Sequence, residues 1–206
     1  MTDTPGLAFW NRVADRYAAR PVREPEAYED TLAHVAAHLA RSDRVLEIGC
    51  GTGSTALRLG GGVALWRATD ASPEMIRIAG AKPAPASVRF AQAEAGEAVE
   101  GAPFDVVCAF HLLHLVPDLE ATLARIHAHL EPGGLFISKT WCFGDMSRRL
   151  RLLIPFLRLF GLFPPARALT ARALRAAIRA AGFEIEDERT FGRSRHAPCI
   201  IARKPA

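Results

Sequence analysis

The sequence predicts a doubly wound α/β fold, in which helices cover both faces of a mostly parallel sheet of seven strands. Short apolar runs alternate with helical segments along most of the chain, as a parallel sheet requires. Residues 104–110 and 134–140 are continuous apolar runs, typical of strands that are buried on both faces. A turn with three glycines separates the first apolar run from the first short helix, which is where such sheets bind ligands.

Seven segments are predicted strands: residues 44–48, 64–69, 87–92, 104–110, 134–140, 183–190 and 199–204. Five are predicted helices between them: residues 26–40, 54–59, 73–79, 119–130 and 170–181. The last helix has an N-cap in Thr170 and a terminating glycine in Gly182. The sequence EPGG, residues 131–134, predicts a turn.

Length and composition indicate a globular protein with one core. The chain has 206 residues, of which 50% are hydrophobic and 23% charged. Its first residues lack the basic and apolar regions of a signal peptide. The four cysteines form no CxxC pair, which favours reduced thiols and a cytoplasmic protein. We expect a single domain over residues 1–206, with an N-terminal cap segment at about 1–40 and an inserted helical cap at about 141–168.

Two helical segments stand outside the alternation, at residues 9–17 and 148–167. Trp10 and Tyr17 are seven residues apart and therefore share one face of the first segment. They could close over a bound ligand or pack on the sheet. Both segments are candidates for a cap over the strand ends.

The second segment is rich in arginine and in large apolar residues. Residues 148–179 contain eight arginines and no acidic residue. Arg148, Arg151, Pro155 and Arg158 fall on one helical stripe, and Pro155 should kink or break a helix there. Three interpretations stay open: a cover for the site, a contact with a second subunit, or peripheral contact of residues 148–163 with an anionic membrane. A cap of leucine and phenylalanine favours an apolar or amphiphilic ligand.

The glycine turn lies in VLEIGCGTG, residues 45–53, with glycines at 49, 51 and 53. The spacing GxGxG differs from the dinucleotide pattern GxGxxG, and no GK[ST] follows as in a phosphate-binding loop. Asp70 ends the second predicted strand, where a carboxylate can accept hydrogen bonds from both hydroxyls of a ribose. The two features together favour an adenosine-like ligand with a free 2′-hydroxyl.

In order along the chain, VLEIGCGTG, DASPEMI, FAQAEA, FDVVCAFHLLHLVPDLEATLARIHAHLEPGGLFI and LRAAIRAAGFEI resemble the class I S-adenosylmethionine-dependent methyltransferases, of the small-molecule "methyltransferase type 11" kind. The resemblance covers roughly residues 9–140 and 170–204. It implies a Rossmann-like sheet of strand order 3-2-1-4-5-7-6 with an antiparallel seventh strand. It also implies S-adenosyl-L-methionine as cofactor and in-line displacement of its methyl group onto O, N or C of an acceptor.

The resemblance assigns Asp70 to the ribose, Met75 to the surroundings of the nucleoside, and Glu47 to the orientation of the turn and the cofactor's amino acid end. Glu94 matches an acid that binds the adenine amino group, although the family usually has aspartate there. The predicted cofactor-binding residues are Tyr17, Glu47, Gly49, Cys50, Gly51, Gly53, Asp70, Ala71, Met75, Glu94, Ala95 and Phe110.

Four histidines are candidates for chemistry. His111 and His114 follow the fourth strand, beside the expected position of the methyl group. His114 resembles a positional histidine of the family, whereas His111 departs from the pattern and is the candidate catalytic base, or else a packed side chain. His34 and His38 have a spacing that can bind a metal, but no carboxylate or thiol pattern joins them, so we expect no metal.

The acceptor is expected to be a small molecule, bound by a monomer or a homodimer. Two alternatives stay open: a non-catalytic domain that binds S-adenosylmethionine or S-adenosylhomocysteine, and a methyltransferase for RNA or protein that docks through the arginines. Nucleic acid is not expected, because AFHL stands where enzymes that methylate base nitrogens have NPPY or DPPY. The glycine spacing disfavours an NAD-dependent oxidoreductase.

Overall fold

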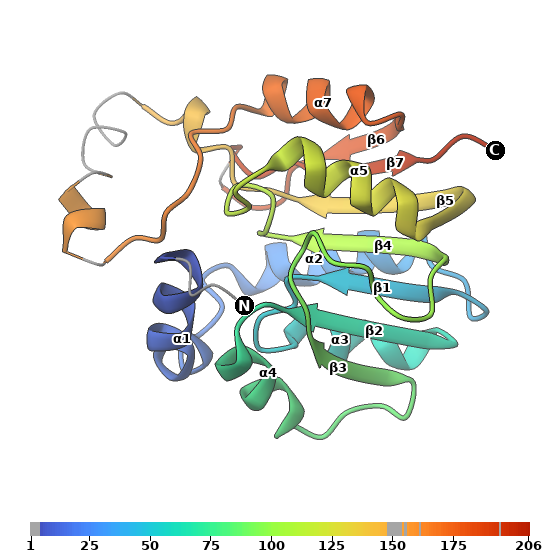
Figure 1. The fold of residues 1–206 in the computed structure, drawn as a ribbon, viewed down its shortest axis with the longest axis horizontal. Helices are drawn as coiled ribbons and strands as arrows, with labels where there is room; N and C mark the ends of the chain where they lie inside the picture. The colour runs from blue at the N-terminus through green and yellow to red at the C-terminus, as the bar shows by residue number, and fades with distance from the viewer. Residues whose placement is uncertain (1–4, 148–153, 155, 161, 194) are drawn as a thin grey trace.

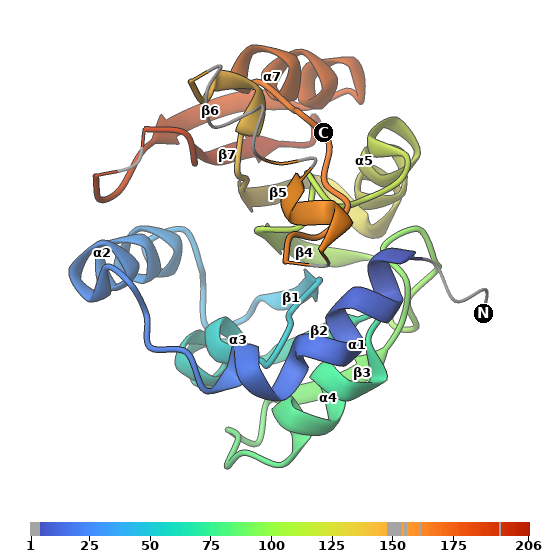
Figure 2. The same ribbon diagram turned by 90° about the vertical axis from the view of Figure 1, so that its left-hand side faces the viewer.

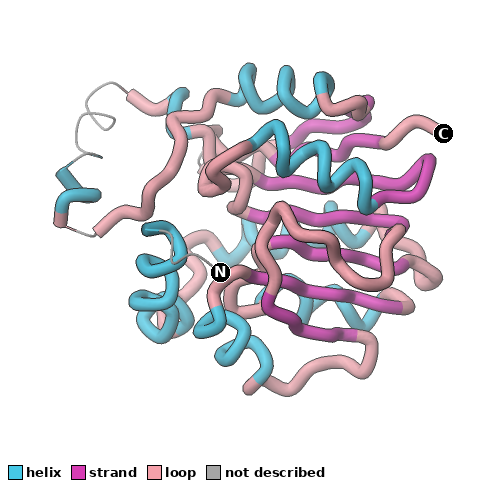
Figure 3. The backbone as a smooth tube through the Cα atoms, viewed as in Figure 1, coloured by secondary structure: helices cyan, strands magenta, loops and turns pink. Residues whose placement is uncertain are grey.

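The computed structural model describes residues 5–147, 154, 156–160, 162–193 and 195–206. It forms three layers, with one sheet between two layers of helices (Figures 1 and 3). The seven strands are β1 (Arg44–Ile48), β2 (Leu65–Asp70), β3 (Val88–Gln92), β4 (Phe104–Phe110), β5 (Leu130–Lys139), β6 (Glu184–Arg189) and β7 (Cys199–Arg203). Their order is β3-β2-β1-β4-β5-β7-β6, and β7 is antiparallel to both of its neighbours. The predicted strand order and the doubly wound fold are confirmed.

The helices are α1 (Pro5–Ala18), α2 (Pro25–Ala36), α3 (Ser54–Leu59), α4 (Pro73–Gly80), α5 (Leu119–His129) and α7 (Ala171–Ala180), with short 3₁₀ turns at Gly60–Gly62 and Phe143–Asp145. The N-terminal helix is longer than the predicted residues 9–17. In contrast, α2 ends four residues earlier than predicted. The backbone N–H of Ala40 donates to the Asp43 carboxylate at 2.8 Å, so the chain already turns toward β1 there.

Apolar side chains from both helical layers bury the two faces of the sheet. Leu123 and Ile126 of α5 pack with Leu174 and Ile178 of α7 on one face. A second cluster, which includes Val35 of α2, Ala56 of α3 and Trp66 of β2, packs on the opposite face. In Figure 1, α5 and α7 lie in front of the sheet and α2 and α3 behind it. Because both faces are covered, a central strand such as β4 reads as a nearly continuous apolar run.

The prediction of a turn at EPGG, residues 131–134, is wrong. These residues belong to β5, where Leu130 pairs with Phe104 and the register shifts before the next pair. Gly133 has a φ of +79°, which marks the irregularity. Backbone hydrogen bonds keep the segment in the sheet, because the N–H of Gly133 donates to Lys204 and the N–H of Lys204 donates to Gly134. The Pro-Gly pattern therefore marks a bulge inside a strand.

The predicted ends of the last helix are confirmed. Thr170 precedes α7, and its hydroxyl accepts a hydrogen bond from the N–H of Ala173 at 3.1 Å. Gly182 follows the helix with a φ of +91°. The predictions for Arg148, Arg151 and Pro155 lie outside the described residues.

Two segments cover the edge at which the parallel strands end. Figure 2 faces this edge and shows α1 and the cap segment, which we define as residues 156–160, 162 and 163, lying across it. The hydroxyl of Ser72, just before α4, donates to the amide oxygen of Asn11 in α1 at 2.6 Å. Gly6 of α1 approaches Pro165, beside the cap segment, so that a Cβ at Gly6 would lie 3.6 Å from Pro165 Cγ. The N-terminal helix therefore spans the space between α4 and the inserted segment.

Among the described residues, no helix is long and apolar enough to cross a membrane.

Candidate active site

The glycine turn between β1 and α3 has a backbone that favours glycine at three positions. Gly49, Gly51 and Gly53 have φ values of +71°, +54° and +78°. A Cβ at Gly49 would lie 2.7 Å from a methyl group of Leu112, and one at Gly53 would lie 2.7 Å from the ring of Phe90. A Cβ at Gly51 would have no neighbour within 4 Å. Gly49 and Gly53 thus permit close packing, while Gly51 faces open space in which a ligand can approach the backbone.

The carboxylate of Asp70 stands beside Gly51 at the end of β2. It accepts two backbone hydrogen bonds of 2.8 Å, from the N–H of Gly51 and from the N–H of Ser72. Each carboxylate oxygen keeps a further lone pair for a ligand hydroxyl. Burial raises the pKa of Asp70, and the two backbone donors oppose that rise. The turn and the acid are thereby held as one unit.

Tyr17 and His111 are exposed side chains whose pKa values are shifted by desolvation. Tyr17 remains 43% exposed, yet desolvation by the surrounding protein, followed by the charge of Asp70, raises its pKa. His111 is also exposed, and desolvation, with a smaller effect from Lys139, lowers its pKa to about 3.

Glu47 and Cys50 lie beneath the turn. Glu47 is 2% exposed, and its carboxyl group accepts a hydrogen bond of 2.9 Å from the indole N–H of Trp66. Burial raises the pKa of Glu47 to about 8, against the effect of Trp66. Cys50 is buried, and its N–H donates to Thr69 in β2 at 2.9 Å. Both residues hold the turn against β2, and a hydrogen bond from the backbone of Ala56 in α3 also opposes the rise in the pKa of Glu47. The contact of Glu47 with the cofactor's amino acid end stays a prediction.

The residues predicted around the nucleoside occupy three environments. Met75 is buried in the first turn of α4, whereas Ala71 is half-buried just after β2. Glu94 is exposed on the loop after β3, and its backbone N–H donates to the carboxylate of Glu97. Ala95 packs at the edge of the core cluster around α5, and Phe110 ends β4 against the opposite cluster. The β2–β3 pairing brings the loop of Glu94 next to Asp70, since the N–H of Ala93 donates to the carbonyl of Asp70.

His111 has a strained backbone at the end of β4. Its φ is +55°, and no other non-glycine residue in the described ranges has a positive φ. Its N–H donates to the carbonyl of Lys139 at 2.6 Å, which ties β4 to the end of β5. Strain of this kind clusters at functional sites. The ring is tilted against that of Trp141, with the ring centres 5.9 Å apart.

Sequence reasoning missed an aromatic row that continues from His111. Trp141 stacks with Phe143 at 6.2 Å, and Phe143 meets the ring of Phe163 edge-on at 5.2 Å. Trp141 and Phe143 are half-buried. Trp141 and Phe143 could have been predicted from their position directly after β5, because such folds bind ligands at this edge of the sheet.

The other three candidate histidines pack against neighbouring rings. His114 is 5% exposed, its ring lies edge-on to Phe143 at 5.1 Å, and burial lowers its pKa to about 4. His34 and His38 contact each other edge-on at 4.9 Å, and His34 lies 3.4 Å from the carboxylate of Asp187. In the ranges described above, no group of three His, Cys, Asp or Glu side chains could hold a metal ion.

Comparison with known proteins identifies a family whose solved members share this fold. The sequence profile of a family described as "Methyltransferase domain" matches residues 19–188. The biotin biosynthesis bifunctional protein BioCD of Bordetella avium is 35% identical over 129 residues, which are 61% of this chain and 28% of that protein. The chain thus spans less than a third of this relative.

Solved structures share the fold at low sequence identity. Magnesium protoporphyrin IX methyltransferase of Synechocystis PCC 6803, solved with bound S-adenosylhomocysteine, has a TM-score of 0.68 and 19% identity, covering 99% of this chain and 96% of that one. An S-adenosylmethionine-dependent methyltransferase of Mesorhizobium loti has a TM-score of 0.68 and 18% identity, covering 86% and 97%. Since the family profile covers most of the chain, the protein belongs to the methyltransferase-domain family, and its fold is that of the solved methyltransferase structures.

Proposed function

We propose that the chain methylates a small, apolar or amphiphilic acceptor at the carboxyl end of β4. The observation that carries this proposal is the half-exposed aromatic pair Trp141 and Phe143, which stands next to His111 beyond the strand ends. Aromatic walls with few polar groups suit an acceptor with apolar surface. In this proposal residues 1–206 act as one domain, with α1 and the cap segment closing over the site.

The residues at the strand ends fit S-adenosylmethionine. The free lone pairs of Asp70 can accept hydrogen bonds from the ribose hydroxyls, and the open space at Gly51 admits a ligand to the backbone. Tyr17 of α1 lies close enough to Asp70 for the carboxylate charge to raise the pKa of the tyrosine. The helix α1 can therefore cover the same ligand. When bound, the cofactor supplies a methyl group on a sulfonium, which is a good leaving group.

The protein's own work is then alignment and exclusion of water. The edge-on contact of Trp10 with Tyr17, at 5.6 Å, stiffens α1 above the site. The hydrogen bond from Ser72 to Asn11 anchors the same helix beside Asp70. We assign the remaining predicted cofactor residues, Met75, Glu94 and Ala95 among them, to the nucleoside side of this site.

His111 is proposed to accept a hydrogen bond from the acceptor's nucleophile. A pKa of about 3 keeps its imidazole neutral above pH 5, so it has a free lone pair but is a weak base. We therefore expect the rate of methyl transfer to show no titration of His111 between pH 5 and 8. The measurement is the pH dependence of kcat/KM in the natural enzyme and in His111→Asn. An ionisation in that window that disappears in the variant would contradict this role.

The cofactor site is tested by calorimetric titration with S-adenosylhomocysteine. Asp70→Asn keeps a side chain of the same size that can still accept a backbone hydrogen bond, but it removes the charge that strengthens hydrogen bonds to the ribose. We expect at least a tenfold weaker affinity, or about 1.4 kcal/mol. Asp30→Asn, an exposed change on α2, is the matched control and should bind as the natural chain does. Thermal unfolding of both variants separates a lost contact from a lost fold. Unchanged affinity in a folded Asp70→Asn would overturn the assignment.

A further inference from the structure

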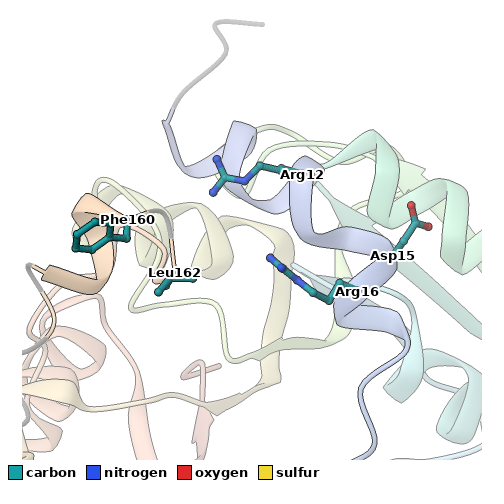
Figure 4. A pocket seen from close by; sticks show the side chains of 5 residues that line it. All are labelled: Arg12, Asp15, Arg16, Phe160 and Leu162. Atoms are coloured by element: carbon teal, nitrogen blue, oxygen red, sulfur yellow. The ribbon is translucent and has the colours of Figure 1, made fainter.

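A groove of about 460 Å³ lies between α1 and the cap segment (Figure 4). It is lined by Arg12, Asp15, Arg16, Phe160 and Leu162. Figure 4 shows the guanidinium groups of Arg12 and Arg16 extending from α1 toward the side on which Phe160 and Leu162 lie, while Asp15 projects in another direction. One wall of the groove is therefore cationic and the other apolar.

Arg16 is the cation of this wall that stays available to a ligand. Arg12 and Arg16 are four residues apart and share one face of α1. The carboxylate of Asp15 is engaged elsewhere, because it accepts a hydrogen bond of 2.9 Å from Arg77 of α4. Arg16 has no hydrogen-bond or ion-pair partner in the part of the chain that the structure describes. A guanidinium in this position can hold a carboxylate or phosphate through two parallel hydrogen bonds.

The apolar wall is unusually exposed. Phe160 is 72% exposed and Leu162 65%, and their neighbours Phe156 and Leu159 are 65% and 79% exposed. Large apolar side chains that gather on one face mark a site for a ligand or partner. The sequence from residue 154 to residue 181 contains no Asp or Glu, so this wall brings no negative charge to the arginines.

The aromatic row described above connects this wall to the reaction site. Leu162 is followed by Phe163, whose ring contacts Phe143, and the row continues through Trp141 to His111. An extended ligand could therefore touch both arginines at one end and reach the carboxyl end of β4 at the other.

We propose that the acceptor is an anionic amphiphile, an inference that rests on the proposed function. Its carboxylate or phosphate group binds Arg16 and Arg12, and its apolar part lies against Phe160 and Leu162. The atom that is methylated lies at the far end of the aromatic row, next to His111. The arginines thus set the position of the acceptor and take no part in bond breaking.

The test is a titration of the protein, saturated with S-adenosylhomocysteine, with three eight-carbon probes at low salt. Octanoate and octyl phosphate carry the two anionic groups, and octanamide is their neutral counterpart. We expect at least one anion to bind tenfold or more tightly than octanamide, with the preferred anion identifying the head group. Arg16→Gln should remove this preference. Arg41→Gln removes an equal charge from an exposed position before β1 and should retain it.

Two further measurements make the result decisive. Phe160→Ser, a change at an exposed side chain, should weaken octanoate binding more than butyrate binding, because only the longer chain reaches the apolar wall. Titration of every variant with S-adenosylhomocysteine alone tests the proposed function separately. If the natural chain does not bind this ligand, the proposed function fails. If it binds but octanamide matches the anions, only the present inference fails.

Two other outcomes would also overturn the inference. One is a tenfold loss of S-adenosylhomocysteine affinity in Arg16→Gln with the anion preference intact, which would assign the arginine to the cofactor. The other is binding to vesicles of anionic phospholipid without binding of the monomeric anions, which would make the groove part of a membrane contact.

Discussion

Gly51→Ala is expected to weaken S-adenosylhomocysteine binding about a hundredfold (about 2.8 kcal/mol) while the protein stays folded. The added methyl group would occupy space that is empty in the protein, since a Cβ there has no neighbour within 4 Å. It would instead meet the ligand that approaches the backbone beside Asp70. The fold loses only the cost of a left-handed alanine at a φ of +54°, about 1–2 kcal/mol. Calorimetric titration and urea unfolding measure the two effects.

Two matched substitutions separate ligand contact from backbone strain. Gly53→Ala combines a φ of +78° with a Cβ only 2.7 Å from the Phe90 ring, so we expect a loss of stability larger than that of Gly51→Ala, by about 1–3 kcal/mol. Gly62→Ala, away from the turn and with free space around its Cβ, should change neither property by much. Equal affinities for Gly51→Ala and Gly62→Ala would show that no ligand approaches Gly51.

The fold was largely predictable because its determinants are local. Continuous apolar runs identify strands with two covered faces, and Thr170 and Gly182 mark helix ends through hydrogen bonds to their own neighbours. The misread segment, residues 131–134, has the same turn-like residues as a true turn. Its backbone groups pair with Lys204, some seventy residues along the chain, and no local pattern encodes that partner.

The candidate site likewise has one part that local motifs predict and another that depends on tertiary packing. Gly51 and Asp70 were found from the sequence because a glycine turn and a strand-end acid recur at fixed places in the motif, and the structure brings them within hydrogen-bond distance. Trp141, Phe143 and Arg16 were missed. They become neighbours of the strand ends only through the packing of α1 and of the segment after β5, which follow no motif. The part of the site that would choose the acceptor is therefore the part that a single sequence does not encode locally.

Glu47→Gln is expected to stabilise the protein at alkaline pH. Burial raises the pKa of Glu47 to about 8 in the folded chain, whereas the ordinary value of 4.5 applies in the unfolded chain. Between these values the folded state keeps a proton that the unfolded state releases. The contribution of this proton to the free energy of unfolding is therefore fully present below about pH 4.5, and it is lost as the pH rises through 8. The full difference corresponds to a loss on the order of 4 to 5 kcal/mol by pH 9.

The glutamine amide removes this proton release and keeps an oxygen that can accept the hydrogen bond from Trp66. Urea unfolding at pH 5, 7 and 9 should give similar free energies for Glu47→Gln and the natural chain at pH 5, and a growing advantage for the variant above it. Glu26→Gln, at an exposed position of α2, is the control for a surface charge and should follow the natural chain. Glu47→Ala should be less stable than Glu47→Gln at every pH, because Trp66 then loses its buried acceptor. If Glu47→Gln instead follows the natural chain at pH 9, Glu47 is ionised in the folded protein, and the buried carboxylate has a counter-charge that its contacts with Trp66 and α3 do not supply.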